Sequence, residues 1–463
     1  MNRPSSHEVL ERMHRGEVIE EQAFDLRLFD AAERAKKKYD IRYDPSCPVP
    51  VDDTMADRCF EAGRELYAEV GTYCVDTHRV ARFTLEEMDE AMEAASDAVT
   101  WGTGADECEL RHRPVGSDVP VFVWGGLQTL MFSDEPTMLA VYRACCRCRD
   151  VHGIWGGIVP TVDQGAEVRG GTPMEVWPYR RSALLLRQAA TEAERPGMCV
   201  RTGAPTAFIL AAQYAGSDGL RPGDGISSGG LPELKTSFDD LARAVFAQSI
   251  GSCLLGGHGA TIGAFSGSVE GAAIVTAASA YQSRLVNAGD MIAAAVTPMQ
   301  VQSRATRSVI WVNALALQAL NRNTHLVVGG PIGDHPAAGP GTKQYFYETA
   351  AALVPGVACG AHMLGGTRKF KIGRTLDYGT PSESAFVGRL ARAAVGIDPS
   401  DAGRIAAELL ARYEDRLQDP PEGGTIHELY DLENERPLPD YRRTLDEVSD
   451  EMRSLGLPLD DEP

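Results

Sequence analysis

The 463-residue sequence lacks any run of 18 or more consecutive apolar residues, although 43% of its residues are hydrophobic. A transmembrane helix needs about 20 such residues in a row, so no membrane span is expected. The first residues, MNRPSSHEVLERMHRGEV, are too polar for the apolar segment of a secretory signal peptide. The sequence therefore predicts a soluble, cytoplasmic protein with enough apolar residues for a large core.

Basic residues are comparatively few. The 45 lysines and arginines stand against 65 aspartates and glutamates, which gives a formal net charge of −20. A nucleic-acid-binding protein needs a basic surface to neutralise phosphates, and no basic stripe is present. We therefore expect no nucleic-acid partner.

Metal and nucleotide motifs are also missing. The chain has ten cysteines, but the cluster Cys145, Cys146 and Cys148 has neither the paired spacing of a zinc site nor that of a disulfide framework. The segment GHGATIG lacks the spacing of a dinucleotide fingerprint, and GPGTK is not a phosphate-binding loop. We predict no bound metal and no nucleotide cofactor.

The middle of the chain, residues 118–395, consists of short apolar runs that end in glycines, separated by helix-length segments. Such runs without polar alternation are typical of parallel strands buried on both faces. Seven can be counted, and an eighth is expected near residues 287–296. The seven are residues 119–126, 152–159, 197–203, 224–230, 252–257, 324–330 and 356–362. The count and length predict an α/β fold, a (β/α)8 TIM barrel, with an open doubly wound sheet as the alternative.

The two flanks are predicted to be helical. Residues 1–117 form an N-terminal helical extension, in which Thr84 and Glu87 have the spacing of a capping box. Residues 396–463 form a C-terminal helical extension packed on the barrel, with apolar residues at helical spacing from Ile405 to Leu417.

Residues at the carboxyl ends of barrel strands line the active site, and glycines there leave room for a ligand. We expect a wide apolar mouth, walled by the glycine pairs with Trp124 and Trp155. The polar residues near these strand ends are the candidates for chemistry: Arg201, Thr202, Asp224, Ser227, His258, Asp334, His335 and His362.

Arg201 is the sharpest candidate, because a cation in the apolar run RPGMCVRTGAP carries a desolvation cost unless an acid or an anionic ligand meets it. Two interpretations are open. Arg201 holds an anionic substrate group at the bottom of the barrel mouth, or it pairs with an internal acid such as Asp224, Glu270 or Asp334 and is structural.

The segment RPGMCVRTGAP resembles the segment of monomethylamine methyltransferases in which Arg-Pro-Gly-Met-Gly-Val precedes pyrrolysine and Gly-Pro. Further similar segments follow the same order along nearly the whole chain: YCVDTHRVARFTLEEMDEAM, WGTGADECELRHRPVG, HPAAGPGTK, RAAVGIDPSDAGRIAAELL and PPEGGTIHELYD. The resemblance implies a (β/α)8 barrel with helical additions, a homo-oligomer, and transfer of a methyl group from methylamine to the corrinoid (cobalamin) of a separate partner protein.

Arg201 stands at the position of the family's pyrrolysine, whose electrophilic imine is thought to hold the amine. A guanidinium has no such imine and stays protonated, so the substrate must differ. The family's Asp-Glu-Gln appears here as Gly256, Gly257 and His258, its Gln-Tyr-Tyr as residues 333–335, and a glutamate as Lys343. The pocket has thus exchanged acids for cations, which suit a carboxylate.

The resulting hypothesis is methyl transfer from a small, carboxylate-bearing quaternary amine or similar donor to a partner corrinoid protein, without pyrrolysine. The predicted catalytic residues are Arg201, His258, Asp334 and His335. The predicted substrate-binding residues are Arg201, Thr202, Asp224, Ser227, Arg307 and Lys343. Arg201 would clamp the carboxylate, and His258 or His335 would protonate the leaving group.

Two alternatives remain open at this point. One is an acid/base enzyme that uses the same barrel on a small anionic metabolite without a corrinoid. The other is a binding or scaffold protein without turnover.

Overall fold

The computed structural model describes residues 3–126, 130–162, 165–228, 230–294, 296–299, 303–330, 332–333, 335–363 and 376–460. Within these ranges no helix combines the length and apolar content needed to cross a bilayer.

Within the described ranges, eight short parallel strands form the centre of the molecule, each followed by a helix. The strands are β6 (Trp124–Gly125), β7 (Gly153–Gly156), β10 (Cys199–Thr202), β11 (Ile226–Ser228), β13 (Leu254–Gly256), β15 (Met291–Ala293), β17 (Val327–Gly330) and β18 (His362–Met363). The helices are α5 (Glu135–Arg147), α6 (Val176–Glu192), α7 (Ala207–Gln213), α8 (Phe238–Ile250), α9 (Val269–Leu285), α10 (Arg307–Asn323), α11 (Lys343–Ala358) and α12 (Pro381–Ala393). This is the predicted (β/α)8 TIM barrel, and the expected eighth strand is β15.

Backbone ladders join the described strands in two sets, β6–β7–β10 and β11–β13–β15–β17–β18. Side chains connect the sets at both seams. At the seam between β10 and β11, Asp224 Oδ1 accepts the backbone N–H of Val200 at 3.0 Å. At the other seam, His362 Nδ1 accepts the N–H of Phe122 at 2.9 Å, just before β6.

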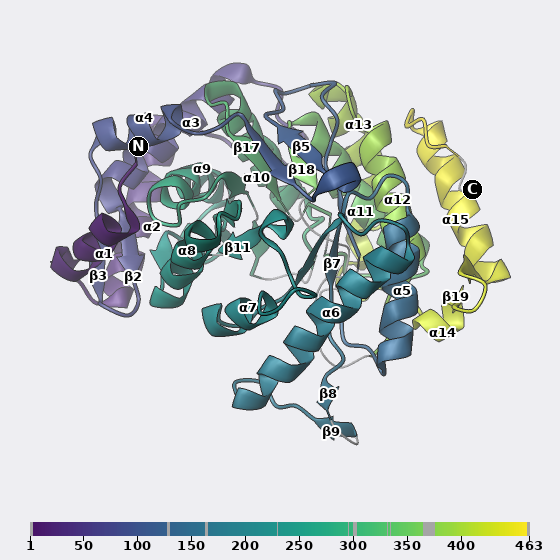
Figure 1. The fold of residues 1–463 in the computed structure, drawn as a ribbon. Coiled ribbons are helices and arrows are strands. Elements are labelled where there is room, and N and C mark those ends of the chain that lie inside the picture. The colour runs from purple at the N-terminus through teal and green to yellow at the C-terminus, as the bar shows by residue number, and fades with distance from the viewer. Residues whose placement is uncertain are drawn as a thin grey trace.

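The N-terminal segment packs on one side of the barrel and the C-terminal helix on the other (Figure 1). The N-terminal elements are α1 (Ser6–Arg15), β1 (Glu17–Val18), α2 (Glu21–Lys38), α3 (Asp53–Val70), β2 (Thr72–Cys74), β3 (Arg79–Ala81), α4 (Leu85–Glu93), β4 (Ala98–Trp101) and β5 (Cys108–Arg111). Helix α3 packs on α9 and α10. The predicted capping box is present, since Thr84 and Glu87 each accept the other's backbone N–H.

The C-terminal elements are α13 (Pro399–Leu410), α14 (Ile426–Leu429), β19 (Tyr430–Asp431), β20 (Arg436–Pro437) and α15 (Pro439–Ser454). Helix α13 packs on α11, and its face of buried residues includes Ile405 and Leu409. Short additional strands are β8 (Thr161–Val162), β9 (Ala166–Glu167), β12 (Lys235–Thr236), β14 (Thr261–Ile262) and β16 (Thr297–Pro298). The predicted divisions at residues 117 and 395 fall between β5 and β6 and between α12 and α13.

The hairpin β4–β5 covers the amino end of the barrel. The N–H of Gly102 donates to Gly223 O, and that of Thr103 donates to Gly197 O, both just ahead of barrel strands. Trp101 and Leu110 of the hairpin belong to the apolar cluster of the barrel interior. The hairpin thereby supplies a floor for any site inside the barrel.

Candidate functional site

Arg201 lies in β10 with its guanidinium inside the barrel. Side chains alternate along a strand, so Arg201 faces the same interior as the buried Cys199. In the ladder between β7 and β10, Arg201 lies opposite Trp155, and Arg201 is 3% exposed. Its guanidinium carbon lies 5.4, 4.8 and 5.2 Å from the ring centres of Trp101, Trp124 and Trp155. We call these three side chains the tryptophan cage.

Arg201 and two tryptophans of the cage present hydrogen-bond donors that meet no acceptor among the described residues. None of the three guanidinium nitrogens of Arg201 has a hydrogen-bond partner among the described residues, and the same holds for the indole nitrogens of Trp124 and Trp155. Burial lowers the pKa of Arg201, yet a guanidinium starts so high that it remains charged. Leaving a buried charge unpaired is costly, and an anion with several lone pairs would satisfy these donors.

A cavity of about 250 Å³ extends from Arg201 along the seam between β10 and β11 towards α7 and α8. Its lining residues are Trp155, Arg201, Thr202, Gly203, Ala204, Leu210, Leu220, Gly225, Ile226, Ser227, Asp240 and Arg243. Arg243 is engaged by Asp239 at 2.9 Å. The volume is sufficient for a molecule of a few heavy atoms, and Arg201 is the lining cation that has no acid partner among the described residues.

Gly225 makes room for the guanidinium. A Cβ atom at this position would lie 2.6 Å from Trp101 Nε1 and 3.1 Å from Arg201 Nη2, and its φ of +70° favours glycine. Any larger residue at position 225 would therefore clash with the Trp101 and Arg201 side chains.

Asp224, predicted to bind substrate or to pair with Arg201, pairs instead with Arg187 of α6. Both of its carboxylate oxygens lie 2.7 Å from Arg187 Nη2. They also accept the N–H groups of Val200 at 3.0 Å and Arg221 at 2.6 Å. The carboxylate is buried and fully engaged, so its contacts give it a structural role and leave Arg201 without it.

The other acids weighed as partners for Arg201 do not change this picture. Glu270 accepts the backbone N–H of Tyr43 at 3.2 Å. Asp334, also predicted to be catalytic, lies outside the described residues. The structural interpretation of Arg201 as half of an ion pair therefore finds no support among the residues described.

Thr202 and Ser227 both line the cavity. The Thr202 hydroxyl donates to Gly203 O at 2.7 Å and accepts from Gln213 of α7 at 3.0 Å, so it anchors the start of the βα loop. Ser227 lies between the outward residues Ile226 and Ser228, which contact α8. By strand alternation Ser227 points to the same interior as Arg201.

His258 follows β13 and is half-buried, whereas His335 follows β17 and is buried. Neither lines the cavity next to Arg201. The backbone carbonyl of His335 accepts the N–H of Arg304 at 3.0 Å. His258 thus follows the second strand after β10 in the barrel, and His335 follows a strand further round.

Arg307 and Lys343, predicted to bind substrate, are not brought to the cavity. Arg307 opens α10 and pairs with Glu414 at 2.6 Å. Lys343 opens α11 and pairs with Glu447 at 2.7 Å and Glu451 at 3.0 Å on α15. Their charges fasten the C-terminal extension to the barrel helices.

His362 lies within β18 rather than beyond it. Its Nδ1 accepts from Phe122 and its Nε2 lies 2.8 Å from the carbonyl oxygen of Arg111, which requires the neutral Nε2–H tautomer. Full burial lowers its pKa to about 3. His362 therefore closes a seam of the barrel.

This burial predicts a pH dependence of stability. Between the unfolded pKa of 6.5 and the folded pKa of about 3, the unfolded chain binds the extra proton, so stability falls as the pH falls through this window. At pH 5 the loss from His362 should be about 2 kcal/mol relative to pH 7. Urea unfolding of wild type and His362→Gln at both pH values checks this: the variant should lose less stability on acidification, and an equal loss in both proteins contradicts the assignment.

Sequence reasoning missed the tryptophan cage as a unit and the role of Arg187. The tryptophans lie in β4, β6 and β7, and no spacing in the chain links Trp101 to the two strand residues. Nothing in the sequence around Arg187 indicates that its side chain pairs with Asp224, just ahead of β11. Only the spatial closure of the barrel brings these groups together.

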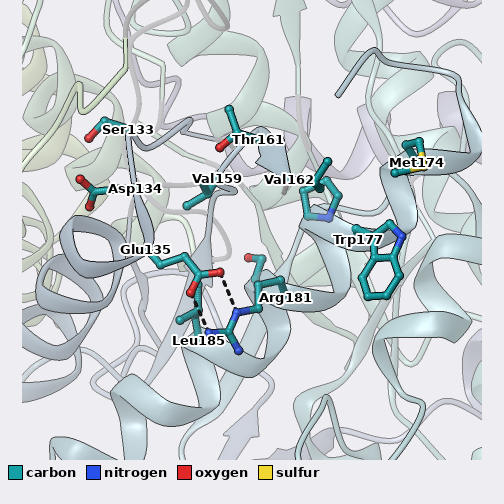
Figure 2. Close-up of a pocket in the computed structure, with 12 residues that line it drawn as sticks. Ser133, Asp134, Glu135, Val159, Thr161, Val162, Met174, Trp177, Arg181 and Leu185 are labelled. Atoms are coloured by element: carbon teal, nitrogen blue, oxygen red, sulfur yellow. Dashed lines mark hydrogen bonds and ion pairs between the residues drawn. The ribbon is translucent and has the colours of Figure 1, made fainter. Parts of the chain in front are cut away.

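A larger cavity of about 450 Å³ lies outside the barrel, between the loop before α5 and the start of α6. Figure 2 shows the bidentate Glu135–Arg181 pair and, apart from it, Met174 and Trp177. Trp177 is 61% exposed. Helices of the barrel begin at the carboxyl ends of the strands, so Met174 and Trp177 at the start of α6 lie on the mouth face of the barrel.

A model of the monomethylamine methyltransferase MtmB family matches residues 5–457. Monomethylamine methyltransferase MtmB2 of Methanosarcina acetivorans is 27% identical over 455 residues, 97% of this chain and 98% of that protein. MtmB of Methanosarcina mazei matches to the same extent. The crystal structure of the Methanosarcina barkeri monomethylamine methyltransferase superposes with a TM-score of 0.91 at 25% identity, covering 98% of each chain. A hydroxylamine complex of MtmB gives the same values.

Proposed function

Because this chain belongs to the monomethylamine methyltransferase MtmB family, we propose that it is a methyltransferase that moves a methyl group from a small, carboxylate-bearing methylated amine to the corrinoid of a separate partner protein. The observation that carries the choice of donor is Arg201, a buried cation whose donors have no acceptor among the described residues. Methylamine alone would bring a second positive charge next to it, and like charges at a buried contact cost several kcal/mol.

The donor's carboxylate would accept from two guanidinium nitrogens of Arg201 in a bidentate contact. Its quaternary ammonium would lie against the partly exposed indole of Trp155, since aromatic faces attract such cations. Two contacts at opposite ends of a small molecule fix its direction, which places the methyl group for in-line transfer.

A corrinoid on the partner would supply the methyl acceptor. The nitrogen–methyl bond breaks with its electron pair remaining on nitrogen, so a quaternary amine leaves as a neutral tertiary amine and needs no proton. Asp334, His258 and His335 remain the proposed acid/base residues for a donor whose leaving group must be protonated. Ser227, which lines the cavity, is retained as a proposed polar contact.

The test uses the purified full-length protein with the corrinoid protein from the same organism. Isothermal titration calorimetry should detect binding of glycine betaine and no binding of methylamine. The corrinoid spectrum should then change on addition of glycine betaine, with dimethylglycine released in equal amount. Methyl transfer from methylamine and none from betaine would contradict the proposed donor, whereas betaine binding without transfer would favour an enzyme or binding protein without a corrinoid.

The docking face for the partner is proposed to be the apolar rim of Met174, Trp177 and Phe208, which are 46%, 61% and 72% exposed. They lie at the amino ends of α6 and α7, next to β7 and β10. Trp177→Ala should raise the partner concentration needed for half-maximal transfer by about tenfold, as truncating a central aromatic contact typically does. Phe29→Ala, 39% exposed on α2, is the control. An equal effect of both variants would reject this face.

A further inference from the structure

A second polar cavity, separate from Arg201, lies where the C-terminal extension meets the barrel. It has a volume of about 480 Å³ and is bounded by the end of α5, by α12 along its length and by the β19–β20 hairpin. The charged residues in its lining are Arg147, Arg149, Asp150, Arg389, Arg392, Glu435, Arg436, Arg442 and Asp460.

The charge of this cavity opposes that of the whole protein. Six arginines and three acids line it, in a chain whose net charge is −20. A local excess of cations on an acidic protein concentrates anions where they would otherwise be repelled. The cavity is therefore a place on the described surface where an anion gains from both shape and charge.

The three acids of the lining pair with only two of its six arginines, and Asp446 outside the lining pairs with Arg442 at 3.0 Å. Asp150 and Asp460 both pair with Arg392, at 3.0 and 2.7 Å. Glu435 pairs with Arg147 and with Arg143, which lies outside the lining. All three carboxylates of the lining are therefore engaged in ion pairs.

Two of the remaining arginines keep donors for a ligand. Arg149 is exposed and makes no ion pair among the described residues. Arg436 meets Asp431 only at 3.8 Å, and its side chain is 72% exposed. The first turn of α12, with Pro381 and Ser382 in the lining, adds the positive end of a 13-residue helix.

We propose that this cavity binds a small molecule with two or more phosphoryl groups. Arginine forks match phosphate oxygens bidentately, and several arginines around one space suit an anion with adjacent charges. The volume falls in the range of small-molecule sites and exceeds what a single phosphate fills. The site is independent of methyl transfer, because it lies on the outside of the barrel between α5, α12 and the C-terminal hairpin.

The experiment is isothermal titration calorimetry of the full-length protein at physiological salt with pyrophosphate, ADP and adenosine. Pyrophosphate and ADP should bind saturably and adenosine should not. Tighter binding of ADP than of pyrophosphate would identify a nucleotide, and equal binding would identify the diphosphate group alone as the ligand.

The variant Arg149→Ala/Arg436→Ala should weaken pyrophosphate binding by at least about tenfold, through loss of two charged donors. Both side chains are exposed, so folding is not at risk. The matched control is Arg15→Ala/Arg42→Ala, which removes two exposed arginines elsewhere. The proposal is overturned if pyrophosphate fails to bind the wild type, or if the control variant weakens binding as much as the test variant.

Discussion

Replacing Arg201 with methionine should abolish binding of the carboxylate-bearing donor while leaving the protein at least as stable as the wild type. The guanidinium is buried without an acid or hydrogen-bond acceptor among the described residues, so its removal takes away a desolvated charge and leaves no stranded partner. Apolar replacements of buried charges are often neutral or stabilising. The lost charge contact should weaken donor binding on the order of 100-fold or more.

Calorimetric titration with glycine betaine and urea unfolding measure the two parts of this prediction. Arg113→Met is the matched control, because Arg113 is also buried but donates to the carbonyl oxygens of Val119, Val357 and Ala361 at 2.9, 3.0 and 2.8 Å. That variant strands several carbonyls and should lose about 3 kcal/mol or more. Severe destabilisation of Arg201→Met, comparable to the control, would show that Arg201 is structural.

Asp224→Ala should lower the free energy of unfolding by about 3–5 kcal/mol, because it strands the buried cation of Arg187. It also removes the acceptor for the N–H of Val200 and with it the side-chain link between β10 and β11. The effect on donor binding should follow only from this structural loss.

The double variant Asp224→Leu/Arg187→Met tests the cause, since removing both charges should recover part of the stability. Urea unfolding of the single and double variants gives the comparison. If Asp224→Ala retained full stability but failed to bind glycine betaine, Asp224 would contact the substrate after all.

The sequence alone determined the barrel and several of its details. Seven apolar runs with glycines at their ends, and an eighth run expected near residues 287–296 that became β15, predicted the strands, and the Thr84–Glu87 spacing predicted a helix start. These features depend on neighbours in the chain, whose periodicity and caps are visible locally. The same local pattern marked Arg201 as a cation in an apolar strand.

Only the tertiary structure decided which charge each polar residue meets. Asp224 pairs with Arg187, 37 residues away in the chain, rather than with Arg201, and Lys343 pairs with Glu447 on α15. Trp124, expected on the mouth wall, is fully buried beside Arg201. A strand-end side chain can turn to the interior, to a helix or across a seam, and that choice depends on how the barrel closes. Closure is a long-range property, which no window of the sequence contains.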